Sequence, residues 1–299
     1  MTGRGVAVAV LACSLALGCT RREPEMLGQP GHPVVLVLSP AHGTPEVARD
    51  LGASLARQSG LAIEVKVASS PDDAVGMLGS PQVDGGIVSL FEYLLARQEF
   101  GVQAAAMVLR GAGQRTYAGV ILVRADGTIT TPRDLAGKRV AFVDPRSTTG
   151  YLLAARSLAE AGVNIQPVFV GSHAAAIDAV RSGRVDAAAT FEAAQDPDLR
   201  VLARTGEVPN EPVVFRAGVP IAVRQRIVGA LTSMAGTEAG RGILGRVAGI
   251  TGFIPAADAD YADVGRLLRE SRQKLEDLVP GGWQLVNERR RPLSELGPY

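Results

Sequence analysis

The apolar residues of this chain fall into short runs that alternate between strand-like and helix-like spacing. The run Val34–Leu38 is continuously apolar, as expected for a strand that is buried on both faces. The next segment, 45–59, repeats apolar residues at helical spacing and stops at Gly60. Further strands are predicted at residues 62–68, 84–88, 104–109, 117–124, 140–143, 167–170, 185–189 and 201–205. Further helices are predicted at residues 71–78, 90–99, 151–161, 174–181, 221–234 and 261–278.

The order strand–helix–strand–helix–strand occurs twice, at about 34–92 and again at about 139–192. Strands that alternate with helices form sheets covered by helices on both faces, so we predict two doubly wound α/β lobes. Ligands of such sheets bind beyond the carboxyl ends of the strands. Those ends, at residues 39–40, 89–90, 147–150 and 171–173, contain serine, and facing lobes would direct all four ends into one cleft.

Charge and cysteine content exclude several classes of protein. The 299 residues contain 31 Lys and Arg against 30 Asp and Glu, so no nucleic-acid partner is expected. Both cysteines, Cys13 and Cys19, lie at the N-terminus, which leaves the rest of the chain without a disulfide or a thiolate metal site. The sequence has no G-x-S-x-G, no Walker A motif and no H-x-x-x-H, so we expect no enzyme, no metal and no cofactor.

The N-terminus reads as a bacterial lipoprotein signal. Residues 1–18 contain Arg4, an apolar stretch too short to span a bilayer, and the ending Ala16-Leu17-Gly18 before Cys19. We expect cleavage before Cys19 and lipid on its sulfur; the alternative is an ordinary secretory signal. Residues 19–33 are rich in Pro and Gly and are predicted to form a flexible tether.

A hydroxyl-rich turn after the strand at 140–143 is the most informative local feature. The sequence K-R-V-A-F-V-D-P-R-S-T-T-G predicts a strand, a tight turn with Ser147, Thr148 and Thr149, and then a helix. A helix start has unpaired N–H groups and the positive end of the helix dipole, and it therefore suits a tetrahedral oxyanion. The alternative is an ordinary N-cap.

Six other side chains are candidates for the same site. They are His173, Tyr117, Tyr93, Ser89, Glu211 and Glu192. The histidine and the tyrosines can donate hydrogen bonds to an anion, although a histidine at this position also caps its own helix and strand tyrosines commonly serve packing. Either acid is unfavourable beside an anion unless the ligand brings a cation or a proton; otherwise both are surface carboxylates.

With these residues identified, the chain resembles the phosphate/phosphite/phosphonate-binding proteins of ABC importers. The resemblance covers about residues 34–275. Its strongest part runs from Tyr117 to Ala193 and includes D-L-A-G-K-R-V-A-F-V-D-P-x-S-T-T-G-Y and G-S-H-A-A-A-I-D-A-V-x-S-G-R-V-D-A. P-N-E-P-V-V at 209–214 and G-F-I-P-A-A-D-A-D-Y at 252–261 add to it.

The resemblance implies a two-lobed periplasmic binding protein, type II-like, in which each lobe is a doubly wound mixed sheet and the ligand cleft lies between them. Lobe 1 would comprise 34–117 plus 216–299, and lobe 2 would comprise 118–215. It also implies that Ser147, Thr148 and Thr149 hold phosphonate oxygens, assisted by Tyr117 and His173.

In family members that take aminophosphonates, two acids face the amine. One falls on Glu211; Glu192 lies about one residue out of register with the other. The tyrosine that the family often carries in an A-x-D-Y loop is absent from Ala68-Ser69-Ser70-Pro71-Asp72-Asp73.

The resemblance finally implies a monomeric solute-binding lipoprotein on the periplasmic or extracytoplasmic face, tethered to the membrane by its lipid. It would pass a small phosphorus oxyanion to a membrane permease with a cytoplasmic ATPase. Three alternatives remain open: a sensor that feeds a membrane kinase, a carrier for another anion such as a sulfonate, and an enzyme.

Overall fold

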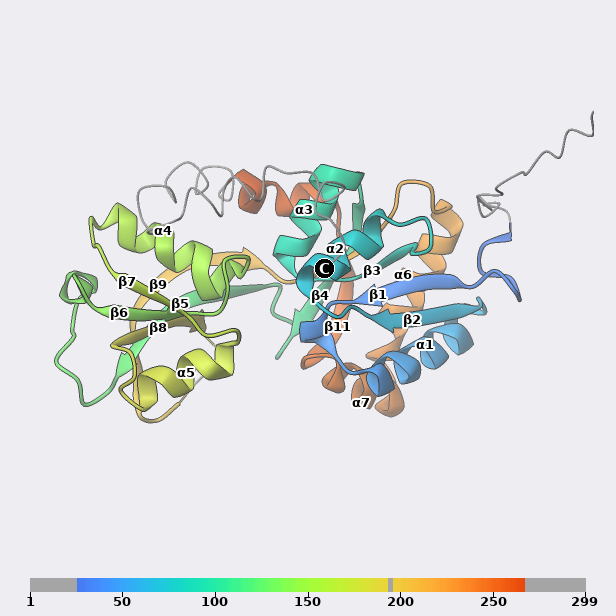
Figure 1. The fold of residues 1–299 in the computed structure, drawn as a ribbon. Coiled ribbons are helices and arrows are strands. Elements are labelled where there is room, and N and C mark those ends of the chain that lie inside the picture. The colour runs from blue at the N-terminus through green and yellow to red at the C-terminus, as the bar shows by residue number, and fades with distance from the viewer. Residues whose placement is uncertain (1–25, 193–195, 267–299) are drawn as a thin grey trace, which may run out of the picture.

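The computed structural model describes residues 26–192 and 196–266, which form two lobes with one β-sheet each (Figure 1). The expected signal peptide, Cys19 and most of the helix predicted at 261–278 lie outside these residues. Within the described ranges, no helix is long and apolar enough to cross a membrane.

The first lobe contains a six-stranded sheet with the order β11-β4-β10-β3-β1-β2. Its central strand β1 runs parallel to β2 and β3, whereas β10 is antiparallel to β3 and β4, and β11 is antiparallel to β4. The strands span β1 (Val34–Leu38), β2 (Ile63–Val67), β3 (Gly85–Ile87), β4 (Gln103–Arg110), β10 (Pro212–Phe215) and β11 (Ile250–Pro255).

The second lobe contains a five-stranded sheet with the order β7-β6-β8-β5-β9. Here β6 runs parallel to β7 and β8, and β5 is antiparallel to β8 and β9. In both lobes the first strand of the parallel trio is the middle one, which confirms the repeated strand–helix cycle. The strands span β5 (Thr116–Arg124), β6 (Arg139–Phe142), β7 (Gln166–Phe169), β8 (Ala187–Phe191) and β9 (Leu199–Pro209).

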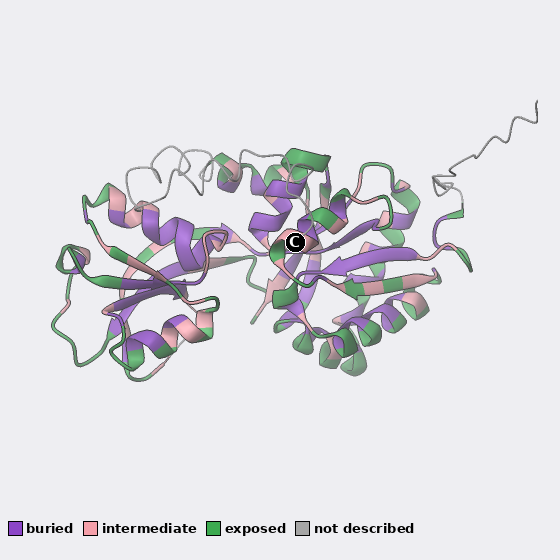
Figure 2. Cartoon of the chain, in the orientation of Figure 1, coloured by how far each residue is buried: buried purple, intermediate pink, exposed green. Residues whose placement is uncertain are grey.

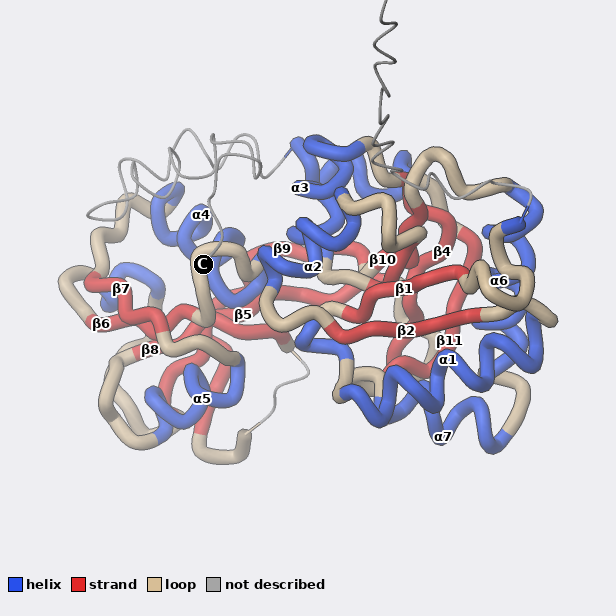
Figure 3. The backbone as a smooth tube through the Cα atoms, turned by 45° about the vertical axis from the view of Figure 1, so that its right-hand side comes forward, coloured by secondary structure: helices blue, strands red, loops and turns tan. Residues whose placement is uncertain are grey.

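Helices cover both faces of each sheet. On the first sheet α1, α6 and α7 pack on one face and α2 and α3 on the other; on the second sheet α4 and α5 take opposite faces (Figure 3). The helices span α1 (Pro45–Ser59), α2 (Pro71–Gly79), α3 (Leu90–Phe100), α4 (Leu153–Glu160), α5 (His173–Arg181), α6 (Ile221–Met234) and α7 (Glu238–Arg246).

Strand β1 shows why its run has no polar position. Successive side chains of a strand point to opposite faces. Val35 and Val37 join the core under α2 and α3, and Val34, Leu36 and Leu38 join the core under α1, α6 and α7. All five are buried, as are most residues of the central strands in Figure 2. The predicted burial of both faces is confirmed.

Among the strands and α-helices of the described residues, three were not predicted, and one of them changes a predicted lobe boundary. These are β10, α7 and β11. Although β10 lies within the range 118–215 that we assigned to lobe 2, it pairs with β3 and β4 of the first sheet. The chain therefore returns to the first lobe at Asn210 and Glu211, between β9 and β10, rather than after residue 215. Asn210 is fully buried, and its Nδ2 donates to the carbonyls of Val108 and Gln114 at 3.1 and 2.8 Å.

The described part of the expected tether, residues 26–33, corrects another prediction. Leu27 is buried in the core under α1. The Ala62 N–H donates to the Gly28 carbonyl at 2.7 Å, and the Gly28 N–H donates to the His32 carbonyl at 2.7 Å. These residues therefore belong to the first lobe. The many Pro and Gly residues form a tight turn here because backbone hydrogen bonds and one apolar anchor hold it.

The packing of this segment predicts a loss of stability when Leu27 is truncated. We expect Leu27→Ala to lower the free energy of unfolding by about 2 kcal/mol, because it leaves a cavity in the core. Met26→Ala is the matched control, since Met26 is 42 % exposed and its truncation should change stability by less than about 0.5 kcal/mol. Urea unfolding measures both; equal effects would contradict the packing.

Candidate functional site

The hydroxyl-rich turn lies directly after β6, as predicted. Ser147 caps it, and its Oγ accepts a hydrogen bond from the Gly150 N–H at 3.0 Å. Thr148–Leu152 forms a π-helical turn that continues into α4. Thr148 and Thr149 are buried, at 6 % and 3 % exposure, yet neither hydroxyl has a hydrogen-bond partner within the described ranges. As the first residues of the turn, they also have N–H groups without a preceding helical carbonyl.

Two glycines let this turn approach the sheet closely. A Cβ on Gly150 would lie 2.4 Å from Val143 Cγ2, so any larger residue would push the turn away from the end of β6. A Cβ on Gly119 of β5 would lie 2.5 Å from Thr205 Oγ1 and 3.4 Å from Thr149 Cβ. The turn therefore rests on the second sheet itself.

His173 begins α5, next to its cap Ser172. Its Nδ1 lies 2.9 Å from the hydroxyl of the fully buried Thr190, and its ring packs edge-on against Phe191. Burial lowers the pKa of His173, and the Asp144 carboxylate partly opposes this shift. His173 therefore lies close enough to Asp144, in the loop before the hydroxyl-rich turn, to interact with its charge. The hydrogen bond to Thr190 orients the ring.

Glu211 lies where the chain returns to the first lobe, and two basic side chains flank it. Arg110 Nη2 is 2.8 Å from its Oε1, and His42 Nε2 is 3.6 Å from the same oxygen. Burial by itself would raise the pKa of Glu211, but hydrogen bonding and charge from His42, together with Arg110, outweigh it and lower the pKa to about 2. Glu211 is therefore a buried, paired carboxylate rather than a solvated one.

Ser89 is part of a capping box at the start of α3. Its Oγ accepts from the Glu92 N–H at 3.3 Å, and its own N–H donates to Glu92 Oε2 at 2.7 Å. Ser39 donates to Glu92 Oε1 at 2.8 Å. Burial raises the pKa of Glu92, although these hydrogen bonds and the nearby His42 oppose it. The chain's own carboxylate thus occupies this helix start.

Tyr117 lies at the start of β5, partly buried and paired with Val208 of β9. Burial raises the pKa of its phenol, the Glu211 carboxylate raises it further, and Arg110 opposes the shift. Tyr117 therefore lies near Glu211, at the junction of the two lobes, and its phenol stays protonated.

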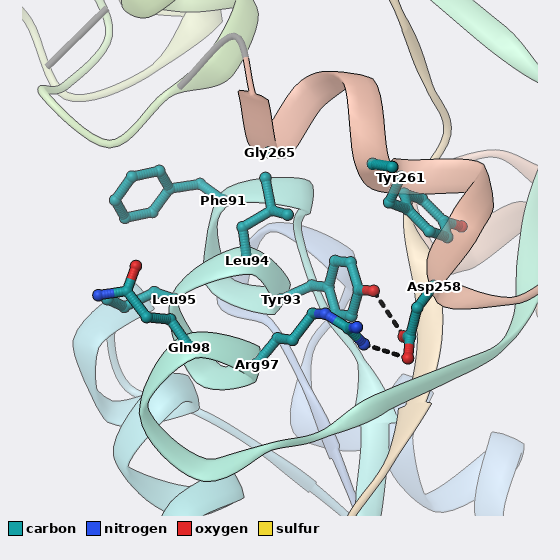
Figure 4. Close-up of a pocket in the computed structure, with 10 residues that line it drawn as sticks. Phe91, Tyr93, Leu94, Leu95, Arg97, Gln98, Asp258, Tyr261 and Gly265 are labelled. Atoms are coloured by element: carbon teal, nitrogen blue, oxygen red, sulfur yellow. Dashed lines mark hydrogen bonds and ion pairs between the residues drawn. The ribbon is translucent and has the colours of Figure 1, made fainter. Parts of the chain in front are cut away.

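Tyr93 and Glu192 have partners away from the hydroxyl-rich turn. Figure 4 shows Tyr93 beside a pocket of about 410 Å³ between α3 and the segment around Asp258. Its hydroxyl donates to Asp258 Oδ1 at 2.7 Å. That hydrogen was the one we expected Tyr93 to donate to an anion. Glu192 forms an ion pair with Arg204 of β9.

An ion pair between the lobes was not foreseen. Arg146, directly before Ser147, places Nη2 2.9 Å from Oδ2 of Asp72 at the start of α2. Asp72 belongs to the loop in which the tyrosine was missing from the family pattern. Both side chains are partly exposed, at 38 % and 43 %.

Glu92, His42 and Arg110 were not identified from the sequence, and only Glu92 lies in a recognisable sequence pattern. Ser89-x-x-Glu92 has the spacing of a capping box, which points to a paired acid at that helix start. His42 and Arg110 carried no local pattern, because they lie 169 and 101 residues from Glu211 and meet it only in the folded chain. Across the described ranges, no group of three or more His, Cys, Asp or Glu side chains could hold a metal ion.

Comparison with known sequences identifies the family. Residues 42–261 match the family described as "ABC transporter, phosphonate, periplasmic substrate-binding protein". The chain belongs to this family. By this description its members are periplasmic substrate-binding proteins of ABC transporters.

Individual relatives of this phosphonate-binding family agree with the assignment. The chain is 31 % identical over 208 residues to the Phosphate-import protein PhnD of Mycolicibacterium smegmatis; the match covers 61 % of this chain and 63 % of that relative, which is less than two thirds of its length. The fold is similar to a binding protein component of an ABC phosphonate transporter from Pseudomonas aeruginosa (TM-score 0.69, 14 % identity, 89 % and 99 % of the two chains). It is also similar to PhnD1 of Prochlorococcus marinus in complex with methylphosphonate (TM-score 0.63, 19 % identity, 79 % and 97 %).

The paired state of Glu211 predicts a pH-dependent contribution to stability. Because its pKa in the folded protein lies below the ordinary value of 4.5, the ionised group stabilises the fold above about pH 4.5 and loses this effect as the pH falls toward 2. We expect Glu211→Gln to lower the free energy of unfolding by about 3 kcal/mol at neutral pH, and the difference from wild type to shrink through that window.

Urea unfolding at a series of pH values measures this difference. Glu64→Gln is the control, since Glu64 faces Lys66 in an exposed pair on β2 and should contribute less than about 1 kcal/mol. Equal stability of Glu211→Gln and wild type at neutral pH would show that the carboxylate is not held by its partners.

Proposed function

We propose that this protein is the solute-binding component of an ABC importer and captures a phosphorus oxyanion (phosphonate, phosphite or phosphate) at the turn Ser147–Thr149. The single observation that carries this proposal is a pair of threonines at a helix start, which are largely buried and whose hydroxyls have no hydrogen-bond partner among the described residues. Neither hydroxyl atom is among the fully buried polar atoms that lack a partner, so both are accessible and can donate a hydrogen bond to an anionic ligand. Their N–H groups and the helix dipole favour an anion.

The surroundings of the turn support an anion further. His173 is oriented by Thr190 and lies at the start of the adjacent helix. Tyr117 keeps its proton and is therefore a hydrogen-bond donor. We assign these two side chains to the oxyanion together with Ser147, Thr148 and Thr149. Ser89, Tyr93 and Glu192 are less suited, because each is committed to a partner in the same lobe.

Capture by closure of the lobes is consistent with the contacts between them. The lobes are joined by the segments 111–115 and 210–211, which are short enough to bend as a hinge. The Arg146–Asp72 pair lies across the lobes, but an exposed pair contributes at most about 1 kcal/mol. That contribution is too small to hold the lobes closed alone, so the bound anion would supply most of the closing energy.

The expected N-terminal lipid on Cys19 and delivery to a permease remain part of the proposal. A lipid anchor would keep the protein at the membrane surface, where the permease is. The family assignment favours an importer over a sensor, since its members are described as ABC transporter components. The Cys13 and Cys19 region lies outside the described residues.

Removing the free hydroxyls should remove binding. We expect methylphosphonate and phosphate to raise the melting temperature of the wild type, since a ligand at a thousand times its dissociation constant adds about 4 kcal/mol. Thr148→Val keeps the shape and removes one donor, and Ser147→Ala removes another; each should weaken binding by about tenfold or more.

A matched control separates binding from capping. Thr237 caps α7 by accepting from the Gly240 N–H at 3.0 Å, much as Ser147 caps its own turn. Thr237→Ala and Ser147→Ala should each lose about 1 kcal/mol of stability. Only Ser147→Ala should also lose the ligand-induced shift. Wild-type shifts in Ser147→Ala and Thr148→Val would refute this assignment of the site.

A further inference from the structure

One ion pair joins the two lobes away from the segments through which the chain crosses between them. Arg146 Nη2, in the loop after β6, lies 2.9 Å from Asp72 Oδ2 at the start of α2. The other ion pairs between described residues join groups of the same lobe or lie at the crossing segments 111–115 and 210–211. Among the described residues, the Arg146–Asp72 pair is therefore the charged contact that opposes separation of the lobes.

The order of the strands places this pair far from the crossing segments. Those segments are continuous with β4 and β10 in the first lobe and with β5 and β9 in the second. Strand β2, which precedes α2, is three strands from β10, and β6 is two strands from β5. Because neighbouring strands are about 4.8 Å apart, these offsets are about 14 Å and about 10 Å. A rotation of the lobes about the crossing segments would therefore separate Asp72 from Arg146.

Arg146 belongs to the same loop as the hydroxyl-rich turn. Its N–H donates to Asp144 Oδ1 at 2.7 Å, and the Ser147 N–H donates to the Asp144 carbonyl at 3.1 Å. These bonds fix the backbone of Arg146 beside Ser147, whose Cα is about 3.8 Å away along the chain. A contact between Arg146 and the first lobe therefore keeps that lobe close to the turn at which we place the anion.

The partner of Arg146 is an acid that α2 does not use for its own cap. Ser70 caps α2 by accepting from the Asp73 N–H at 3.1 Å, and Asp73 Oδ2 accepts from the N–H and the hydroxyl of Ser69 at 2.7 and 2.8 Å. Asp73 thus serves its own loop, whereas Asp72 contacts the second lobe. Both side chains of the pair are partly exposed, so the pair can break and form again at a small cost in free energy.

We propose that the Arg146–Asp72 pair is a latch, which forms as the cleft closes over an anion at the turn Ser147–Thr149 and slows the release of that anion. This inference rests on the proposed function of the turn. An exposed ion pair is weak enough to break when the lobes open, and it is strong enough to slow release by about threefold to fivefold. A pair of this strength retains the ligand without preventing its delivery.

The variant Asp72→Asn tests the latch by the sign of its effect. Asparagine keeps the shape and removes the charge, so methylphosphonate and inorganic phosphate should dissociate about threefold to fivefold faster and bind correspondingly more weakly. Charge repulsion alone predicts the opposite, because removal of an acid near an anion site should strengthen binding. Phosphorus NMR exchange spectroscopy measures the dissociation rate, and isothermal titration calorimetry measures the affinity. Unchanged or slower dissociation from Asp72→Asn would overturn the inference.

A double-mutant cycle with Arg146→Gln tests whether the two residues act as a pair. Arg146→Gln should speed dissociation less in the Asp72→Asn background than in the wild type, because its partner is already absent there. The control is Asp50→Asn, which breaks the exposed ion pair of 2.7 Å between Arg246 and Asp50 within the first lobe and should leave dissociation unchanged. Additive effects of Asp72→Asn and Arg146→Gln would show that these residues act separately, which contradicts a latch.

Ionic strength tests the same pair in the wild-type protein. Salt at about 1 M screens exposed charges beyond about 3 Å. Dissociation from the wild type should therefore approach the rate of Asp72→Asn as sodium chloride is raised to this concentration, and the rate of the variant should change less. An equal salt dependence of the two proteins would show that the pair does not retain the ligand.

The same titrations separate the latch from the proposed function. If neither inorganic phosphate nor methylphosphonate binds to the wild type, the proposed function fails and the inference fails with it. If both bind and Asp72→Asn and Arg146→Gln release them at the wild-type rate, the proposed function stands and only the latch is overturned.

Discussion

Burial of both faces of the central strands is the constraint on which the rest of this molecule depends. Strand β1 and residues 140–142 of β6 have helices on either side, so a polar side chain at these positions would lose its water. Polar groups can gather only beyond the strand ends. The hydroxyl-rich turn after β6 and Ser39 after β1 both occupy such ends. The candidate site is thus a consequence of how the sheets are covered.

The buried acids of the protein have partners, whereas the hydroxyls of the turn Ser147–Thr149 do not all have one. Glu92 is buried and Glu211 is largely buried, and each is paired or hydrogen-bonded by the chain itself. Thr148 and Thr149 are largely buried, and their hydroxyls have no partner among the described residues. Hydroxyls and N–H groups at a helix start donate hydrogen bonds, so the turn favours an anion.

The strand–helix order and most element positions could be read from the sequence because they depend on local periodicity. The predicted ranges 34–38, 45–59 and 221–234 coincide with β1, α1 and α6. Strands β10 and β11 escaped prediction, since one begins with proline and the other contains Gly252 and Pro255. Both strands form by hydrogen bonding to β4, which is distant from them in the sequence, so no local pattern could predict them.

The sequence by itself determined the family, the repeated α/β cycle and the hydroxyl-rich turn, because each depends on residues close together in the chain. Only the tertiary structure decided the state of the acids. Arg110 and His42 come from distant segments to meet Glu211, and Arg146 meets Asp72 across the lobes. The tertiary structure also decided that Leu27 anchors a segment rich in Pro and Gly, because its burial depends on the residues of the first lobe that pack against it.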